Sequence, residues 1–266
     1  MMPGGVDRYI LDLAGAARAS GYEVSVLIER SSGNALGPAL EENGIETHRC
    51  RLYHRSYDDD VIARECLDVL RRAAPDLLHV VCGIPWSCLT LRETAAARGL
   101  ATVVTEQYVP EGLELSPAVS ARIETLYGAS RQVIFVSAGN RNEMERRVRF
   151  DAARACVIPN AVGVGEIRAR CPSPQSRLER AKERRSAGSL RVMTAARLAP
   201  QKGVDLLIAA AAALGADAGM RFDLYGEGPE RESLEERCRE LGLSRTVRFH
   251  GWCGDVPGEL AEHDLF

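Results

Sequence analysis

Short apolar segments alternate with amphipathic ones along almost the whole chain. Residues 22–28, with the sequence YEVSVLI, are rich in β-branched residues and follow a segment whose apolar residues recur with a helical period. Short apolar strands between helices are typical of a parallel sheet covered on both faces, because such strands are buried on each side. The alternation therefore predicts an α/β fold with parallel sheets.

The pattern defines the expected elements and divides them into two groups. Helices are expected at residues 6–20, 36–42, 59–72, 86–98, 117–127, 140–149, 204–214, 230–241 and 257–262. Strands are expected at residues 22–28, 45–50, 77–81, 101–105, 132–136, 155–158, 190–195, 221–225 and 246–250, with a further strand beginning at 264–266. We expect an N-terminal lobe over residues 1–170, a solvated linker over the serine-rich and basic residues 171–189, and a second, partial lobe over 190–266.

The composition is that of an ordinary globular protein. Of its 266 residues 45% are hydrophobic, and the formal net charge is -3, which gives no indication of nucleic-acid binding. No apolar run approaches the roughly 18 residues of a membrane span, and Asp7, Arg8 and Asp12 interrupt any export signal. We expect a cytoplasmic protein whose eight cysteines are reduced, because none forms a C-x-x-C pair.

Loops that follow parallel strands are the places to look for a site, because ligands bind beyond the carboxyl ends of such strands. The strand-end loops of both lobes are expected to face one cleft. Gly4 and Gly5 directly precede a helix, where glycine permits close backbone approach and free N–H groups attract anions, although glycine there is often only a turn.

A second loop, residues 196–203, carries Arg197 and Lys202 on either side of a turn, and Gly203 opens the next helix. Two cations beside a helix N-terminus suit a diphosphate, although a surface loop with ordinary charges would look similar. The chain has only two lysines, Lys182 and Lys202.

Two more strand-end turns complete the candidates. Gly226-Glu227-Gly228 is not a dinucleotide fingerprint, because the third glycine is absent; it either admits a ligand to the backbone or is only a tight turn. Asn160 lies in the turn after the strand at 155–158.

Six segments in order carry a family resemblance: PGGVDRYILDLAGAARASGYEVSVL, FVSAGNRNEM, VIPNAV, ARLAPQKGVDLLIAA, FDLYGEGPERESLEE and VRFHGWCGDVPGEL. Together they resemble the GT-B-fold glycosyltransferases of family 4. The resemblance implies two Rossmann-like lobes and transfer of a sugar, with retention at the anomeric carbon, from a nucleotide-diphosphate sugar to a glycan or lipid-linked acceptor. It implies no cofactor beyond this co-substrate, and peripheral attachment to the cytoplasmic face of a membrane is compatible with it.

The resemblance also implies roles for individual residues. Arg197 and Lys202 match the basic pair that stabilises charge on the leaving diphosphate, and are the expected catalytic residues. The expected donor-binding residues are Gly4, Gly5, Asn160, Gly226, Glu227, Gly228 and Gly251. On the acceptor side Gln107 replaces a histidine that is frequent in the family, and glutamine cannot take up a proton near neutral pH. His79, within LLHVV, is expected to be a satisfied core residue.

Both ends of the sequence depart from the family pattern. The family has a strand before the glycine loop, where only Met1 and Met2 precede Pro3, and an E-x7-E motif after the segment that begins DLF here. The resemblance therefore implies that the first strand of the first lobe and the last part of the second are missing from this sequence. Glutamate pairs with the same spacing, such as Glu106/Glu114 and Glu227/Glu235, are not assigned that role.

Other interpretations stay open. The chain is compatible with a non-catalytic remnant of such an enzyme, or with a GT-B sugar-nucleotide epimerase. The run Asp58-Asp59-Asp60 contains D-x-D, a metal-binding feature of the other large glycosyltransferase fold, but its place before a helix favours capping, and no metal is expected. The basic residues of the linker are compatible with a lipid surface, although Glu179 and Glu183 dilute their charge.

Overall fold

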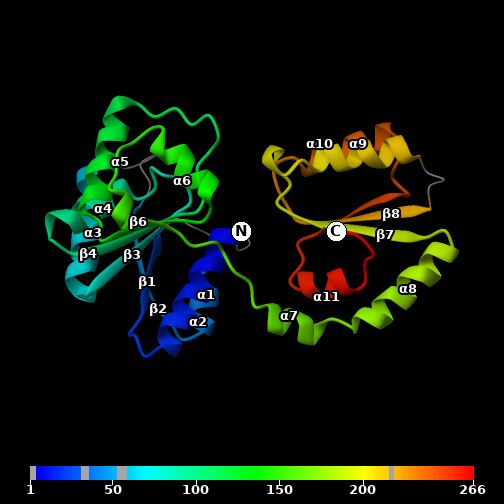
Figure 1. The fold of residues 1–266 in the computed structure, drawn as a ribbon, viewed down its shortest axis with the longest axis horizontal. Coiled ribbons are helices and arrows are strands. Elements are labelled where there is room, and N and C mark those ends of the chain that lie inside the picture. Colours follow the sequence, from blue (N-terminus) through cyan, green and yellow to red (C-terminus); the bar gives the residue numbers. More distant parts are fainter. Residues whose placement is uncertain (1–3, 31–35, 53–58, 216–218) are drawn as a thin grey trace. The chain divides into compact units, whose positions relative to one another are not determined.

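The computed structural model describes residues 4–30, 36–52, 59–215 and 219–266, and it divides the chain into two compact units, Met1–Ala161 and Val162–Phe266 (Figure 1). Each unit has its own parallel sheet structure, which confirms the predicted α/β fold. The expectation of a missing strand before Gly4 concerns a part of the chain that lies outside the described residues.

The first unit alternates helices and strands as the sequence predicts. Its elements are α1 (Gly5–Ala19), β1 (Ser25–Glu29), α2 (Leu36–Glu42), β2 (Glu46–Cys50), α3 (Asp59–Ala73), β3 (Leu77–Cys82), α4 (Leu89–Ala97), β4 (Ala101–Glu106), α5 (Pro117–Ala129), β5 (Gln132–Phe135), α6 (Ala138–Glu145), the 3-10 turn η1 (Ala152–Arg154) and β6 (Ala155–Val157). β1 pairs in parallel with β2, and β3, β4, β5 and β6 form a second parallel sheet in that order.

The two sheets of the first unit share part of their core. The apolar cluster around α3 includes Ile62 and Cys66, and Leu27 of β1 and Leu78 of β3 both pack against it. A second cluster packs α5 and α6 on the four-stranded sheet, with Phe135 and Met144 fully buried. Because strands of one sheet share their direction, the carboxyl ends of β3, β4, β5 and β6 lie at one edge, where Gln107 and Asn160 follow.

The second unit is smaller and repeats the same architecture. Its elements are α7 (Val164–Arg170), α8 (Pro174–Ser186), β7 (Leu190–Ala195), the 3-10 turn η2 (Pro200–Lys202), α9 (Val204–Leu214), β8 (Met220–Tyr225), α10 (Arg231–Glu240), β9 (Val247–Gly251) and α11 (Val256–Ala261). The sheet order is β7-β8-β9, all parallel, with α9 and α10 on one face and α8 and α11 on the other (Figure 1). Leu265 forms a parallel bridge to Val192 on the free side of β7, where the sequence predicts a further strand.

Residues 174–186, which lie within the expected solvated linker, form the helix α8. The Ser173 hydroxyl caps this helix by accepting from the Ser176 amide at 3.1 Å, and Pro174 follows at the first helical position. The boundary between the units lies at Ala161/Val162, before the predicted end of the first lobe at residue 170, because α7 belongs to the second unit and contacts α11.

In the described parts of the chain no helix has the length and apolar character needed to cross a bilayer.

Candidate functional site

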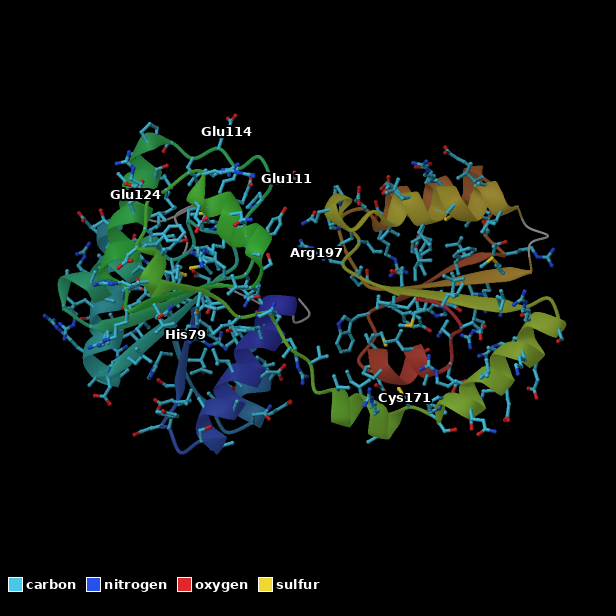
Figure 2. The ribbon with its side chains drawn as sticks, viewed as in Figure 1. His79, Glu111, Glu114, Glu124, Cys171 and Arg197 are labelled. Carbon is cyan, nitrogen blue, oxygen red and sulfur yellow. The ribbon has the colours of Figure 1, made fainter. Side chains whose placement is uncertain are left out.

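The loop after β7 carries two exposed cations and is anchored by buried residues. Leu198 and Ala199, between Arg197 and Lys202 in sequence, are buried and anchor the loop in the core of the second unit. Arg197 and Lys202 are both exposed, and within the described residues neither forms an ion pair (Figure 2 labels Arg197). Since the anchor orders the backbone while the charges stay free, the loop can offer a guanidinium and an ammonium to an anion.

Gly203 places Lys202 at the start of α9. The glycine adopts a left-handed conformation with φ 62°, which ends η2 and allows α9 to begin at Val204. The N–H groups of the first turn of a helix lack partners within the helix and carry a partial positive charge. The ammonium of Lys202 and the N-terminus of α9 therefore lie next to each other in the chain, as the sequence predicts.

The turn after β8 packs directly on the loop after β7. A Cβ at Gly226 would overlap the carbonyl oxygen of Ala196, and one at Gly228 would overlap that of Leu198. The Leu198 amide donates to the Glu227 carbonyl at 3.0 Å, and the Glu230 amide donates to the Leu198 carbonyl at 3.1 Å. Both glycines are therefore required by contact between two backbones, a reason the sequence alone does not reveal.

The end of β9 joins the same group of loops. The Gly226 amide donates to the Gly251 carbonyl at 2.6 Å, and Gly251 has φ 77°. The Glu227 carboxylate lies beside Gly251 and forms an ion pair with Arg231, with Oε1 and Nη1 2.5 Å apart. Since Arg231 neutralises Glu227, the cations at Arg197 and Lys202 keep this edge of the sheet attractive to an anion.

Of the residues predicted to bind the donor in the first unit, Gly4 and Gly5 start α1. The Gly4 amide donates to the Asp7 carboxylate at 2.7 Å, so it is already satisfied within the helix. Gly5 has open space around its Cα, because a Cβ there would meet no atom within 4 Å. Both glycines are exposed, so neither is required by packing within the described residues.

Gln107 and Asn160, far apart in sequence, meet at the carboxyl edge of the four-stranded sheet. The Asn160 Nδ2 donates to the Gln107 Oε1 at 2.8 Å. Asn140 of α6 donates through Nδ2 to the Gln107 carbonyl at 3.3 Å, and sequence reasoning missed it. The Gln107 Nε2 is buried without a partner among the described residues. Carboxamides such as those of Gln107 and Asn160 can exchange hydrogen bonds with hydroxyl groups but cannot transfer protons near neutral pH.

A buried ionisable residue, Glu106, directly precedes Gln107 in the chain, and sequence reasoning missed it as well. Glu106 is fully buried in β4 and accepts a hydrogen bond from the Tyr127 hydroxyl at 2.7 Å, while the buried Arg92 stacks on the Tyr127 ring at 5.4 Å. Burial raises the pKa of Glu106, although Arg92 and Tyr127 favour its ionised form. Figure 2 shows Glu114 on the loop between β4 and α5, outside that buried environment, so the spacing of Glu106 and Glu114 carries no joint role.

The remaining candidates have structural explanations. His79 is partly buried in β3, its Nε2 lies 2.8 Å from the Thr105 hydroxyl, and burial lowers its pKa; this confirms a satisfied core histidine. Asp59 and Asp60 occupy the first turn of α3, where acidic side chains suit the helix dipole, whereas Asp58 lies outside the described residues.

Two models of known protein families match this chain, one mainly in the first unit and one in the second. The family model described as Glycosyltransferase Family 4 matches residues 3–165, and the model described as Glycosyl transferases group 1 matches residues 175–266. LpsE of Rhizobium meliloti strain 1021, a lipopolysaccharide core biosynthesis glycosyltransferase, is 36% identical over 110 residues. The match covers 41% of this chain and 29% of LpsE, so it spans less than a third of that relative.

Solved structures show the same fold. HepE of Anabaena, crystallised in complex with UDP, is similar with a TM-score of 0.74 at 20% identity, over 99% of this chain and 70% of HepE. WaaG, a glycosyltransferase involved in lipopolysaccharide biosynthesis, is similar with a TM-score of 0.65 at 15% identity, over 98% of this chain and 70% of WaaG. The fold is therefore that of GT-B glycosyltransferases, and the chain belongs to glycosyltransferase family 4.

Proposed function

We propose that this chain belongs to an enzyme that transfers a sugar from a nucleotide-diphosphate donor to a glycan or lipid-linked acceptor, with retention at the anomeric carbon. The observation that carries the proposal is a pair of exposed cations, Arg197 and Lys202, which lie beside the buried anchor Leu198 and have no ion-pair partner in the part of the chain that the structure describes. UDP and UDP-glucose are the natural first probes, because HepE binds both.

The proposed role of the two cations is electrostatic. When the bond between the anomeric carbon and the diphosphate oxygen breaks, the electron pair stays on the diphosphate and its negative charge increases. A guanidinium and an ammonium already in place stabilise that charge more in the transition state than in the ground state, and this difference accelerates the step. Gly226, Glu227, Gly228 and Gly251 are proposed to line the donor beside them, with Gly4, Gly5 and Asn160 contributing from the first unit.

On the acceptor side we propose a hydrogen-bonding role for Gln107. The Asn160 side chain holds the side-chain carboxamide of Gln107, and the Asn140 side chain holds its backbone carbonyl. These two hydrogen bonds fix both the orientation and the position of the Gln107 side chain. A carboxamide can orient a sugar hydroxyl by donating and accepting, but it cannot act as a base. No resident metal or cofactor is part of the proposal.

The proposed place of action is the cytoplasm, including the cytoplasmic surface of a membrane. Helix α8 exposes three cations, Arg177, Lys182 and Arg185, beside two carboxylates, Glu179 and Glu183, and this net positive surface supports a contact with anionic lipids. Binding to vesicles that contain anionic lipid would identify surface attachment, and a protein that stays in solution would limit the proposal to soluble acceptors.

The first test is UDP binding by Lys202→Ala. Removing the ammonium deletes a charge-assisted contact to phosphate, so the Kd for UDP should rise about tenfold or more in isothermal titration calorimetry. Lys182→Ala is the matched control, because Lys182 is the other lysine of the chain and lies on α8. It should bind UDP as the parent chain does.

Two outcomes would contradict the assignment. Unchanged affinity in Lys202→Ala would remove this residue from the donor site, and no UDP binding by the parent chain would reject UDP as the donor nucleotide. Incubation of UDP-glucose without an acceptor separates the reactions, because formation of an epimer there would identify an epimerase.

A further inference from the structure

The buried carboxylate of Asp223, in the central strand of the second unit, holds three partners. Asp223 is only 2% exposed. The His250 Nε2 donates to its Oδ1 at 2.6 Å, and its Oδ2 lies 3.1 Å from the His263 Nε2 and 3.3 Å from the Arg191 Nη2. Burial alone would raise the pKa of Asp223, but the hydrogen bonds from these three residues hold it below its ordinary value. The carboxylate is therefore a charged anchor inside the sheet.

One partner, His250, sits at an irregularity in the sheet. Leu224 of β8 pairs with Phe249 of β9, but the next residue of β8, Tyr225, pairs with Gly251. His250 is therefore an extra residue in β9, that is, a β-bulge, which redirects its side chain relative to a regular strand. In this bulge the ring of His250 reaches the Asp223 carboxylate.

The bulge sets the position of the strand-end loops. Because β9 gains one residue, Gly251 comes opposite Tyr225, and its carbonyl accepts the Gly226 amide at 2.6 Å. The ring of His250 stacks on the ring of Tyr225, with centroids 4.6 Å apart and planes 13° apart. The Gly226–Gly251 hydrogen bond and the Tyr225–His250 ring stack together fix the ends of β8 and β9 relative to each other.

The same anchor reaches α11 on the face of the sheet that this helix covers. The Tyr225 hydroxyl donates to the Glu259 carboxylate at 2.7 Å, and the His263 Nδ1 lies 2.6 Å from the Glu259 carbonyl oxygen. Tyr225, the residue before Gly226, is thus held on its ring face by His250 and at its hydroxyl by α11. None of these groups is among the residues expected to touch the donor.

We propose that Asp223 and His250 are positioning residues, which hold the β9 bulge and thereby fix Gly226 and Gly251 where the nucleotide diphosphate binds. The inference rests on the proposed function, because it gives these residues their role through the donor loops. Without the Asp223–His250 contact the bulged residue loses its only side-chain hydrogen bond among the described residues, and the Gly226–Gly251 contact loses its fixed register. The affinity for the nucleotide then falls even in a folded protein.

The decisive variant is His250→Phe. Phenylalanine can keep the stack on Tyr225 but cannot donate to Asp223, so it isolates the hydrogen bond from the ring contact. Since a hydrogen bond to a charged group is worth more than a neutral one, the Kd for UDP should rise about tenfold, measured by calorimetry well below the unfolding temperature.

A rescue variant and a control separate positioning from general stability. His250→Gln retains an N–H donor in place of the ring nitrogen and should recover most of the UDP affinity despite losing the stack. His48→Phe, in β2 of the first unit, removes a histidine that has no part in the donor loops and should leave UDP affinity unchanged.

Each outcome has one meaning. Weak binding by His250→Phe, with recovery in His250→Gln, supports the inference. Parental UDP affinity in His250→Phe overturns it, even if the melting temperature falls, and leaves the proposed function standing. If His250→Phe does not fold, His250→Leu replaces it, because leucine likewise cannot donate to Asp223, and parental affinity in that variant overturns the inference. No UDP binding by the parent chain would reject UDP as the donor nucleotide and, with it, this inference.

Discussion

Individual residues differ in how far the sequence could predict them. The positions of Arg197 and Lys202 in a strand-to-helix loop follow from neighbouring residues alone, so they were predictable. The contact of Gln107 with Asn160 depends on two strand ends meeting, and the anchoring role of Asp223 depends on histidines from two other segments. A charged residue in the middle of the apolar strand FDLY was a visible signal for Asp223, but its partners were not.

At the same scale, Gly226 and Gly228 should tolerate no side chain. A methyl group at either position would overlap a carbonyl oxygen of the loop after β7, and Gly226 also has φ 139°. We expect Gly226→Ala and Gly228→Ala each to lower the free energy of unfolding by about 2 kcal/mol or more, measured by urea denaturation.

Gly165 provides the matched control within the same unit. It lies in α7 with open space around its Cα, and alanine is the better helix former, so Gly165→Ala should be neutral or slightly stabilising. Equal stabilities for all three variants would contradict the packing of the two loops described above.

At the scale of elements, periodicity predicted the helices and strands that bury an apolar face. Periodicity did not predict α8, because this helix has no buried residue. Ion pairs hold the helix instead: Arg180 pairs with Glu262 at 2.8 Å, and Arg184 pairs with Asp264 at 3.0 Å. These partners follow about 80 residues later in the chain. A helix stabilised by such distant ion pairs has no local apolar pattern, so the serine and proline content of its sequence was taken for a linker.

The ion pair of Arg184 should therefore matter more than the other charges of α8. The Asp264 side chain is only 4% exposed, and it also accepts the Arg191 amide at 2.9 Å. Arg184→Ala leaves that carboxylate without its guanidinium, so we expect a loss of about 2 kcal/mol in unfolding free energy. Because Arg185 is exposed on the same helix, Arg185→Ala should change stability by less than about 0.5 kcal/mol. Similar losses in both variants would show that α8 is not held through Asp264.

At the scale of the whole molecule, the two units have separate cores. The second unit packs Leu198, Ile208, Phe222 and Leu234 into one cluster that draws only on its own elements. The family relationship was predictable from six motifs in order, since each follows a strand or opens a helix. The boundary was not, because α7 gives no sign in its sequence that it packs on α11.

This separation predicts that residues 162–266 fold alone. Since Arg197, Lys202 and the loops after β8 and β9 all lie in this unit, the fragment should unfold cooperatively and retain measurable UDP binding. An unfolded fragment, seen by circular dichroism, would show that the second core is not self-sufficient.

The backbone contact between Ala196–Leu198 and Gly226–Gly228 has a consequence for protein engineering. Swapping one of these loops for that of a relative with another donor preference would pair a foreign backbone with a surface shaped for the native one. Chimeras designed to change the donor should therefore exchange residues 196–203 and 226–230 as a single cassette. A library that varies only one of the two would mostly sample misfolded proteins, whatever the merit of the new side chains.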